Sequence, residues 1–364
     1  MVEVALLLTI SDVGEQVAWN GFLAQRDSDL IFKKGNNAWQ ELLCRGRLWT
    51  PDPQLNRVMQ SGRIETVRHI QRLRTGLAGT DRLLERTPAL VASSDAFDIV
   101  QSRNLLAHLR RVADRSEGNL PRVLPQRIKD PIPHLDVTTL LQTNGAYLIA
   151  LAAHLQRHFD AKVLEQHYAS VCTVADRLIL AYAGATGAQR SPVEDAALVR
   201  ALVAAQSLAR LYGDEVNLAR WQSEVASRPL LPATTPGAHK EPFQLPPDWE
   251  MRDNGVWAFA DPWHGIEFAG RVIWDATGLQ LLNNQLAVTQ RWPETWRWWA
   301  LLDLPQGEDR RLSLVWDGHT LHATEPVVTT LPLALHAKIR ALHTSEDDFA
   351  LTFEFVTEAA GEST

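Results

Sequence analysis

Residues Arg228–Pro247, with the sequence RPLLPATTPGAHKEPFQLPP, decide how this chain is divided. This stretch holds six prolines and little apolar periodicity, which is typical of a linker, and we place the linker itself at residues 231–247. Runs rich in leucine and alanine precede it, whereas nine of the thirteen tryptophans follow it, between Trp249 and Trp316. The change in composition predicts an α+β protein, with helices before the linker and strands after it.

The residues before the linker carry clear helix signals. Ser191, Pro192 and Glu194 form a capping-box pattern at the start of one helix, and Gly213 marks its end. Such signals, together with short loops between leucine-rich and alanine-rich runs, indicate antiparallel helices. We therefore expect residues 130–230 to form an all-α middle domain.

The preceding residues, 53–129, are expected to form a basic helical segment, in which Ser93-Ser94-Asp95 offers cap candidates for a second helix. From Arg57 to Lys129 there are 14 arginine or lysine residues against seven acidic ones, although the whole chain has a net charge of -7. This segregation favours an acidic partner, nucleic acid included. The alternative is a solvated helix face that pairs with the acidic remainder. The arginines predicted to bind such a partner are Arg68, Arg72, Arg74, Arg110 and Arg111.

The two ends of the chain are predicted to contain strands. Residues 1–52 begin with the β-branched and leucine-rich run Val2–Ile10, followed by cap residues, which indicates a short strand–helix segment. Short alternating runs and an Asp-Gly dipeptide predict a Trp-rich, mainly antiparallel β domain over residues 248–357, before a tail at 358–364. Whether the N-terminal strand joins the later sheet is left open.

The composition predicts a cytoplasmic protein. Cys44 and Cys172 are the only cysteines, too few for a disulfide framework, which favours a reducing compartment. The apolar start of the chain includes Glu3 and lacks the basic region of an export signal. No uninterrupted run of about 18 apolar residues occurs, so we expect no membrane span and no membrane partner.

One catalytic pattern stands out, Arg103-Asn104-Leu105-Leu106-Ala107-His108. It resembles the RNxxxH signature of the HEPN ribonuclease superfamily, helical proteins of prokaryotic defence and toxin systems. The resemblance covers these six residues and implies metal-independent RNA cleavage where two protomers meet. It implies that Arg103 stabilises phosphate charge, that Asn104 orients the pair and that His108 transfers protons. The alternative is that His108 lies beside a buried leucine stripe.

Two histidines raise the question of a metal site. His154 and His158 lie one helical turn apart, as in half of a zinc site. No third ligand lies in register with them, so we expect solvated histidines on an amphipathic helix and assign no metal. The chain also contains no Walker loop, GxSxG elbow, HExxH motif, paired CxxC or kinase signature, and we assign no cofactor.

The segment QRWPETWRWW, residues 290–299, combines tryptophans with arginines. Such side chains stack on nucleobases or on a sugar, or hold a peptide by cation–π contact, and the candidate binding residues are Trp292, Trp296, Arg297 and Trp299. The alternative is that the rings fill the core of a small β domain.

These patterns favour a non-catalytic binding or scaffold subunit of an intracellular prokaryotic assembly, with protein partners and with nucleic acid as a further candidate partner of the basic segment. The absence of common cofactor and hydrolase motifs supports this expectation. The alternative is a metal-independent HEPN-like ribonuclease that uses Arg103 and His108. A third is a small-ligand sensor with a pocket between the helical and strand-rich parts.

Overall fold

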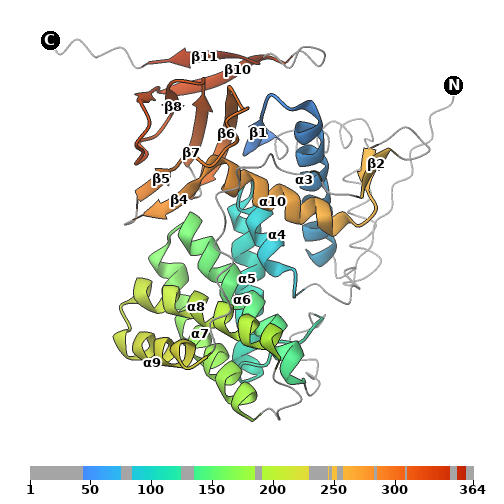
Figure 1. Cartoon of the computed structure of the whole chain (residues 1–364), viewed down its shortest axis with the longest axis vertical. Helices are drawn as coiled ribbons and strands as arrows, with labels where there is room; N and C mark the ends of the chain where they lie inside the picture. Colours follow the sequence, from blue (N-terminus) through green and yellow to red (C-terminus); the bar gives the residue numbers. More distant parts are fainter. Residues whose placement is uncertain are drawn as a thin grey trace, which may run out of the picture.

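The fold comes from a computed structural model (Figure 1) that describes residues 44–74, 84–123, 135–184, 191–228, 245, 248–251, 257–282, 285–307, 310–344 and 351–357. It confirms the α+β class, with an all-helical middle and mainly antiparallel strands toward the C-terminus. The predicted strand Val2–Ile10, nearly all of the linker and the tail lie outside the described residues.

A bundle of helices occupies the lower part of Figure 1. Its leucines, valines and alanines form one buried cluster with the fully buried rings of Tyr147 and Trp221. The capping box predicted at Ser191 and Glu194 is confirmed, and Gly213 ends that helix with a φ of 84°. None of the described helices is long and apolar enough to cross a membrane. The bundle consists of α5 (Ile99–Arg115), α6 (Val137–Arg157), α7 (Ala161–Ala183), α8 (Pro192–Tyr212) and α9 (Glu215–Ala226).

The main sheet has the strand order β1-β6-β7-β8-β9, in which only β8 and β9 run parallel. Its first strand comes from the N-terminal part of the chain and pairs with β6, so this described strand joins the C-terminal sheet. The strands are β1 (Arg47–Trp49), β6 (Trp299–Gln306), β7 (Arg310–Trp316), β8 (Leu321–Ala323) and β9 (Leu333–Leu335).

Three two-stranded ribbons accompany the main sheet. One of them covers a face of the sheet, because its Ile339 packs against Ala300 of β6 and Val315 of β7. The opposite face contributes Trp299 and Leu301 to the core beneath the sheet. The ribbons are β2 (Trp249–Met251) with β3 (Trp257–Phe259), β4 (Leu279–Leu282) with β5 (Gln285–Val288), and the covering pair β10 (Lys338–Thr344) with β11 (Leu351–Val356).

A helix that the sequence analysis did not predict, α10 (Pro262–Thr277), lies within the Trp-rich part. Helix α3 (Pro53–Arg74) packs along it, so that a Cβ on Gly62 would lie 2.2 Å from the carbonyl oxygen of Gly265. Residues of α3 therefore share one core with the sheet, although the linker separates the two in sequence. The domain boundaries inferred from the sequence stay a prediction.

Helix α4 (Thr87–Ser94) lies between the sheet side and the bundle (Figure 1). It packs against α10 on one side and against α6 on the other. Its Val91 belongs to the core of the bundle, its Leu90 packs with Trp263 and Ile266 of α10, and Ala96 just beyond it belongs to the core beneath the sheet. This short helix thus joins the two cores.

Candidate functional site

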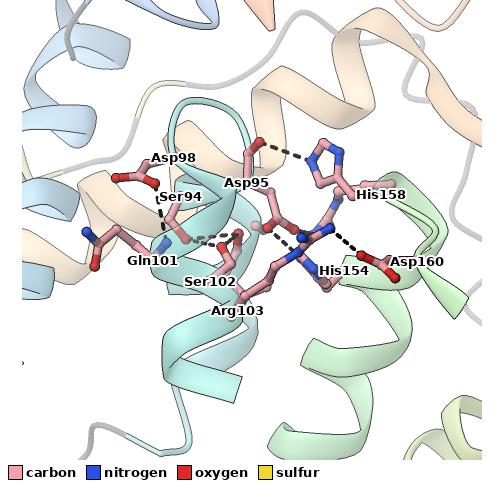
Figure 2. Close-up of polar contacts among 12 residues, drawn as sticks. Ser94, Asp95, Asp98, Gln101, Ser102, Arg103, His154, His158 and Asp160 are labelled. Atoms are coloured by element: carbon pink, nitrogen blue, oxygen red, sulfur yellow. Dashed lines mark hydrogen bonds and ion pairs between the residues drawn. The ribbon is translucent and has the colours of Figure 1, made fainter. Parts of the chain in front are cut away.

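A buried carboxylate lies where α4 meets the end of α6 (Figure 2). Asp95 directly follows α4 and is 0% exposed. His154 Nδ1 donates to Asp95 Oδ1 at 2.7 Å, and Arg157 Nη1 donates to Oδ2 at 3.3 Å. His158 Nε2 donates to the backbone carbonyl of Asp95 at 3.1 Å. Three side chains from the end of α6 therefore converge on one residue, and we call these four residues the Asp95 cluster.

The charges of the Asp95 cluster are fixed by burial and by proximity. Burial alone would raise the pKa of Asp95, but the charge and hydrogen bond of His154, with the charges of His158 and Arg157, hold that pKa well below its usual range. Burial lowers the pKa of His158 to about 4, although Asp95 opposes this effect. At neutral pH, Asp95 is therefore ionised and His158 is neutral.

Trp274 of α10 closes the Asp95 cluster on the side of the sheet. Its ring lies 4.9 Å from the guanidinium of Arg157 and makes an edge contact with His158, with 5.9 Å between ring centroids. The indole N–H of Trp274 donates to the carbonyl oxygen of Ala92 in α4 at 2.7 Å. The Asp95 cluster thus fastens the end of α6 to both α4 and α10.

The expectation that His154 and His158 are solvated was wrong. Their exposed fractions are 0% and 5% because Asp95, which lies 59 residues before His154, supplies partners inside the protein. Among the described residues, no group of three or more His, Cys, Asp or Glu side chains is arranged to hold a metal ion. The predicted cap at Ser93-Ser94-Asp95 was also displaced, since Asp98 caps α5 by accepting from the backbone N–H of Gln101.

Arg103 lies beside the Asp95 cluster, as Figure 2 shows, and its Nη2 lies 2.9 Å from Oδ2 of Asp160, the N-cap residue of α7. Arg103 and His108 are separated by five positions on one helix, which rotates their side chains by about 140° relative to each other. The two catalytic candidates of the RNxxxH pattern therefore point to different sides of α5.

His108 belongs instead to a polar stripe along the outer side of α5. Asn104, His108, Arg111 and Arg115 follow one another at spacings of four, three and four residues, which places them on one face. Three of them are exposed and His108 is half-buried. Burial, followed by the charge of Arg111, lowers the pKa of His108. The spacing of three residues makes these two side chains neighbours on the helix surface. We call these four residues the α5 stripe.

Several other arginines of the basic segment pair with acidic side chains of the same chain. The pairs are Arg86 with Glu267 at 2.9 Å, Arg122 with Glu85 at 2.9 Å and Arg68 with Glu65 at 2.6 Å. The pair of Arg86 with Glu267, like that of Arg103 with Asp160, joins the basic segment to the acidic remainder of the chain and so cancels part of its excess charge, whereas the other two pairs lie within the segment.

The remaining predicted arginines lie in different surroundings. Arg110 donates from Nη1 to the backbone carbonyl of Gln166 in α7 at 2.8 Å. Arg72 and Arg74 lie at the end of α3, and their side chains are outside the described part of the structure. Among the predicted basic binding residues with described side chains, only Arg111 belongs to the α5 stripe.

The tryptophans of the segment 290–299 lie mainly inside the protein. Trp292, Trp296 and Trp299 are 5%, 8% and 0% exposed and pack in the core beneath the sheet. Trp292 also contacts Trp299 and Trp316, with ring centroids 5.0 and 5.4 Å away. Arg297 is exposed. The core-filling alternative describes the three rings, and a binding role for this segment stays a prediction.

Comparisons of the chain with family models, with curated proteins and with solved structures found no significant match.

Proposed function

We propose that the chain is a non-catalytic binding subunit of an intracellular assembly, with the α5 stripe as its contact for an anionic partner, in the first place nucleic acid. The proposal rests on side chains of the α5 stripe that have no polar partner among the described residues. No side-chain hydrogen bond or ion pair is formed by Asn104, His108 or Arg111 among the described residues. In contrast, ion pairs are formed by Arg68, Arg86, Arg103 and Arg122. An exposed and unpaired guanidinium is free to bind a phosphate.

The burial of the Asp95 cluster argues against a catalytic role for its acid–base groups. A general acid or base must reach the proton that it transfers. Asp95 and His154 are 0% exposed, and His158 is 5% exposed, so these groups serve the packing of the protein. The intracellular setting rests on the free cysteines Cys44 and Cys172, and the prokaryotic setting rests on the resemblance of six residues in α5.

The dimensions of the α5 stripe suit a nucleic-acid backbone. From Asn104 to Arg111 the helix rises by about 10 Å, which is long enough to face more than one phosphate. Each arginine that neutralises a phosphate releases condensed counterions, so binding of this kind weakens steeply as the salt concentration rises.

Filter retention of labelled single-stranded RNA and duplex DNA, at about 50 mM and about 200 mM salt, tests this proposal. The variant Arg111→Ala should bind several-fold more weakly and show a salt slope smaller by about 1. Arg57→Ala is the matched control, because Arg57 is also exposed and lies on α3 of the same basic segment. Salt-independent retention, or equal losses in the two variants, would contradict a contact through the α5 stripe.

The ribonuclease alternative has one specific observation in its favour. Burial and the charge of Arg111 lower the pKa of His108, which favours an imidazole that can accept a proton, and Arg111 on the same face of α5 would stabilise phosphate charge. The same incubation, read for cleavage of the RNA without metal, decides between the two functions. Cleavage that is lost in His108→Ala and Arg111→Ala but kept in Arg103→Ala would replace the non-catalytic proposal with a ribonuclease built on the α5 stripe.

A further inference from the structure

The contacts around His158 leave no place for a second proton on its ring. Its Nε2–H is already donated to the carbonyl of Asp95, and its Nδ1 is buried without a hydrogen-bond partner among the described residues. A proton added to Nδ1 would therefore create a buried charge without an acceptor. We propose that the Asp95 cluster is an acid-operated latch, in which protonation of His158 releases the end of α6 from α4 and α10 while the helical bundle stays folded.

The charged groups around His158 strengthen this argument. From its own helix, His154 and Arg157 both oppose a positive charge on His158. The carboxylate of Asp95 favours that charge, but it already accepts hydrogen bonds from His154 and Arg157. From α10, Asp275 acts on Arg157, and Trp274 presents its ring to both Arg157 and His158. An imidazolium at this position meets the guanidinium of Arg157 and a carboxylate that is already shared.

The direction of the pH effect follows from proton linkage. In the closed latch, with the end of α6 fastened to α4 and α10, the pKa of His158 is about 4. In an open latch we expect the ordinary value of 6.5. Between these pH values the closed latch binds fewer protons than the open one. The stabilisation of the closed state is therefore fully present above pH 6.5 and is lost as the pH falls toward 4. From pH 7 to pH 5, the open-to-closed ratio should rise about 20-fold.

His167 provides a matched control inside the bundle. It is 2% exposed, and burial lowers its pKa to about 4, as for His158. However, its Nδ1 pairs with the hydroxyl of Tyr147 at 2.8 Å, between α6 and α7 and away from α10. The effect of protonating His167 should therefore fall on the contact between α6 and α7, whereas protonation of His158 should release the end of α6 from α4 and α10.

Hydrogen exchange with mass spectrometry at pH 7 and pH 5, corrected for the intrinsic effect of pH, separates these events. In the wild type, peptides from α4 and α10 should lose about 20-fold in protection at pH 5, and peptides from α8 should keep theirs. His158→Gln should abolish the change at α4 and α10, whereas His167→Gln should leave it in place.

Three results would overturn the latch. The first is unchanged protection of α4 and α10 in the wild type at pH 5, a comparison that needs no variant to fold. The second is a loss of protection in α8 to the same extent, which would indicate general acid unfolding. The third is an opening that persists undiminished in His158→Gln.

Discussion

The contact between α6 and α4 depends on Asp95, and a substitution that removes the charge of Asp95 tests this. Asp95→Asn keeps the shape of the side chain but leaves Arg157 and His154 beside a neutral partner in a buried site. Because loss of one member of a buried ion pair leaves an uncompensated charge, we expect the free energy of unfolding to fall by about 3 kcal/mol. Urea denaturation at pH 7 measures this loss.

Asp160→Asn is the control for that substitution. Asp160 pairs with Arg103, but the two side chains are 28% and 21% exposed, and asparagine caps a helix about as well as aspartate. Loss of this partly exposed ion pair should therefore lower the free energy of unfolding by less than about 1 kcal/mol. Equal losses in the two variants would mean that the burial of Asp95 does not decide its contribution.

The local part of this site was visible in the sequence, but its assembly was not. The sequence placed His154 and His158 on one side of a helix, and it assigned Asp95 a capping role within its own segment. A pattern read over a few residues gives no information about partners far along the chain. The position of His108 beside Arg111 was accessible, because spacings of three and four residues define one helix face.

At the scale of elements, two glycines that end helices differ in their surroundings. Gly213 after α8 and Gly278 after α10 both have positive φ angles, 84° and 57°. A Cβ on Gly213 would have no neighbour within 4 Å, whereas a Cβ on Gly278 would lie 1.9 Å from the carbonyl oxygen of Thr289.

Substitution by alanine at these two positions separates backbone strain from crowding. Gly213→Ala should cost about 1 kcal/mol, because alanine disfavours the left-handed conformation. Gly278→Ala should cost about 1 to 3 kcal/mol more, since the backbone of Thr289 must also move. Urea denaturation of both variants tests the difference, and similar losses would show that the turn after α10 adjusts at little cost.

The helices and strands differ in how well they could be predicted from the sequence. The helix α8 was predicted from its caps, and the strands around Asp317-Gly318 from their hairpin signal. Helix α10 has comparable signals, with Asp261 at its cap, Pro262 at its first position and Gly278 at its end. However, its tryptophans and β-branched residues favour strands, so the composition pointed away from a helix despite these cap signals. The pairing of β1 with β6 depends on tertiary contacts that no local pattern contains.

At the scale of the whole molecule, the two cores share structural parts. Helix α4 packs against both cores. Trp274 of α10 donates a hydrogen bond to the backbone of α4, and the Asp95 cluster connects α6 of the bundle to the residue that follows α4. Two cores that share a buried helix cannot lose their packing independently unless that helix changes its environment. The proline-rich linker therefore separates stretches of different composition, while packing across the chain connects them.

This connection predicts one cooperative unfolding transition at pH 7. Val91→Ala, a change on the bundle side of α4, should remove about 2 kcal/mol of stability. It should shift the transition seen by far-UV circular dichroism, which reports mainly on the helices, and that seen by tryptophan fluorescence, which reports mainly on the sheet core, by the same amount. A shift confined to the helical signal would show that the cores unfold separately. Because an open latch weakens their connection, the two transitions should move apart as the pH falls from 7 to 5.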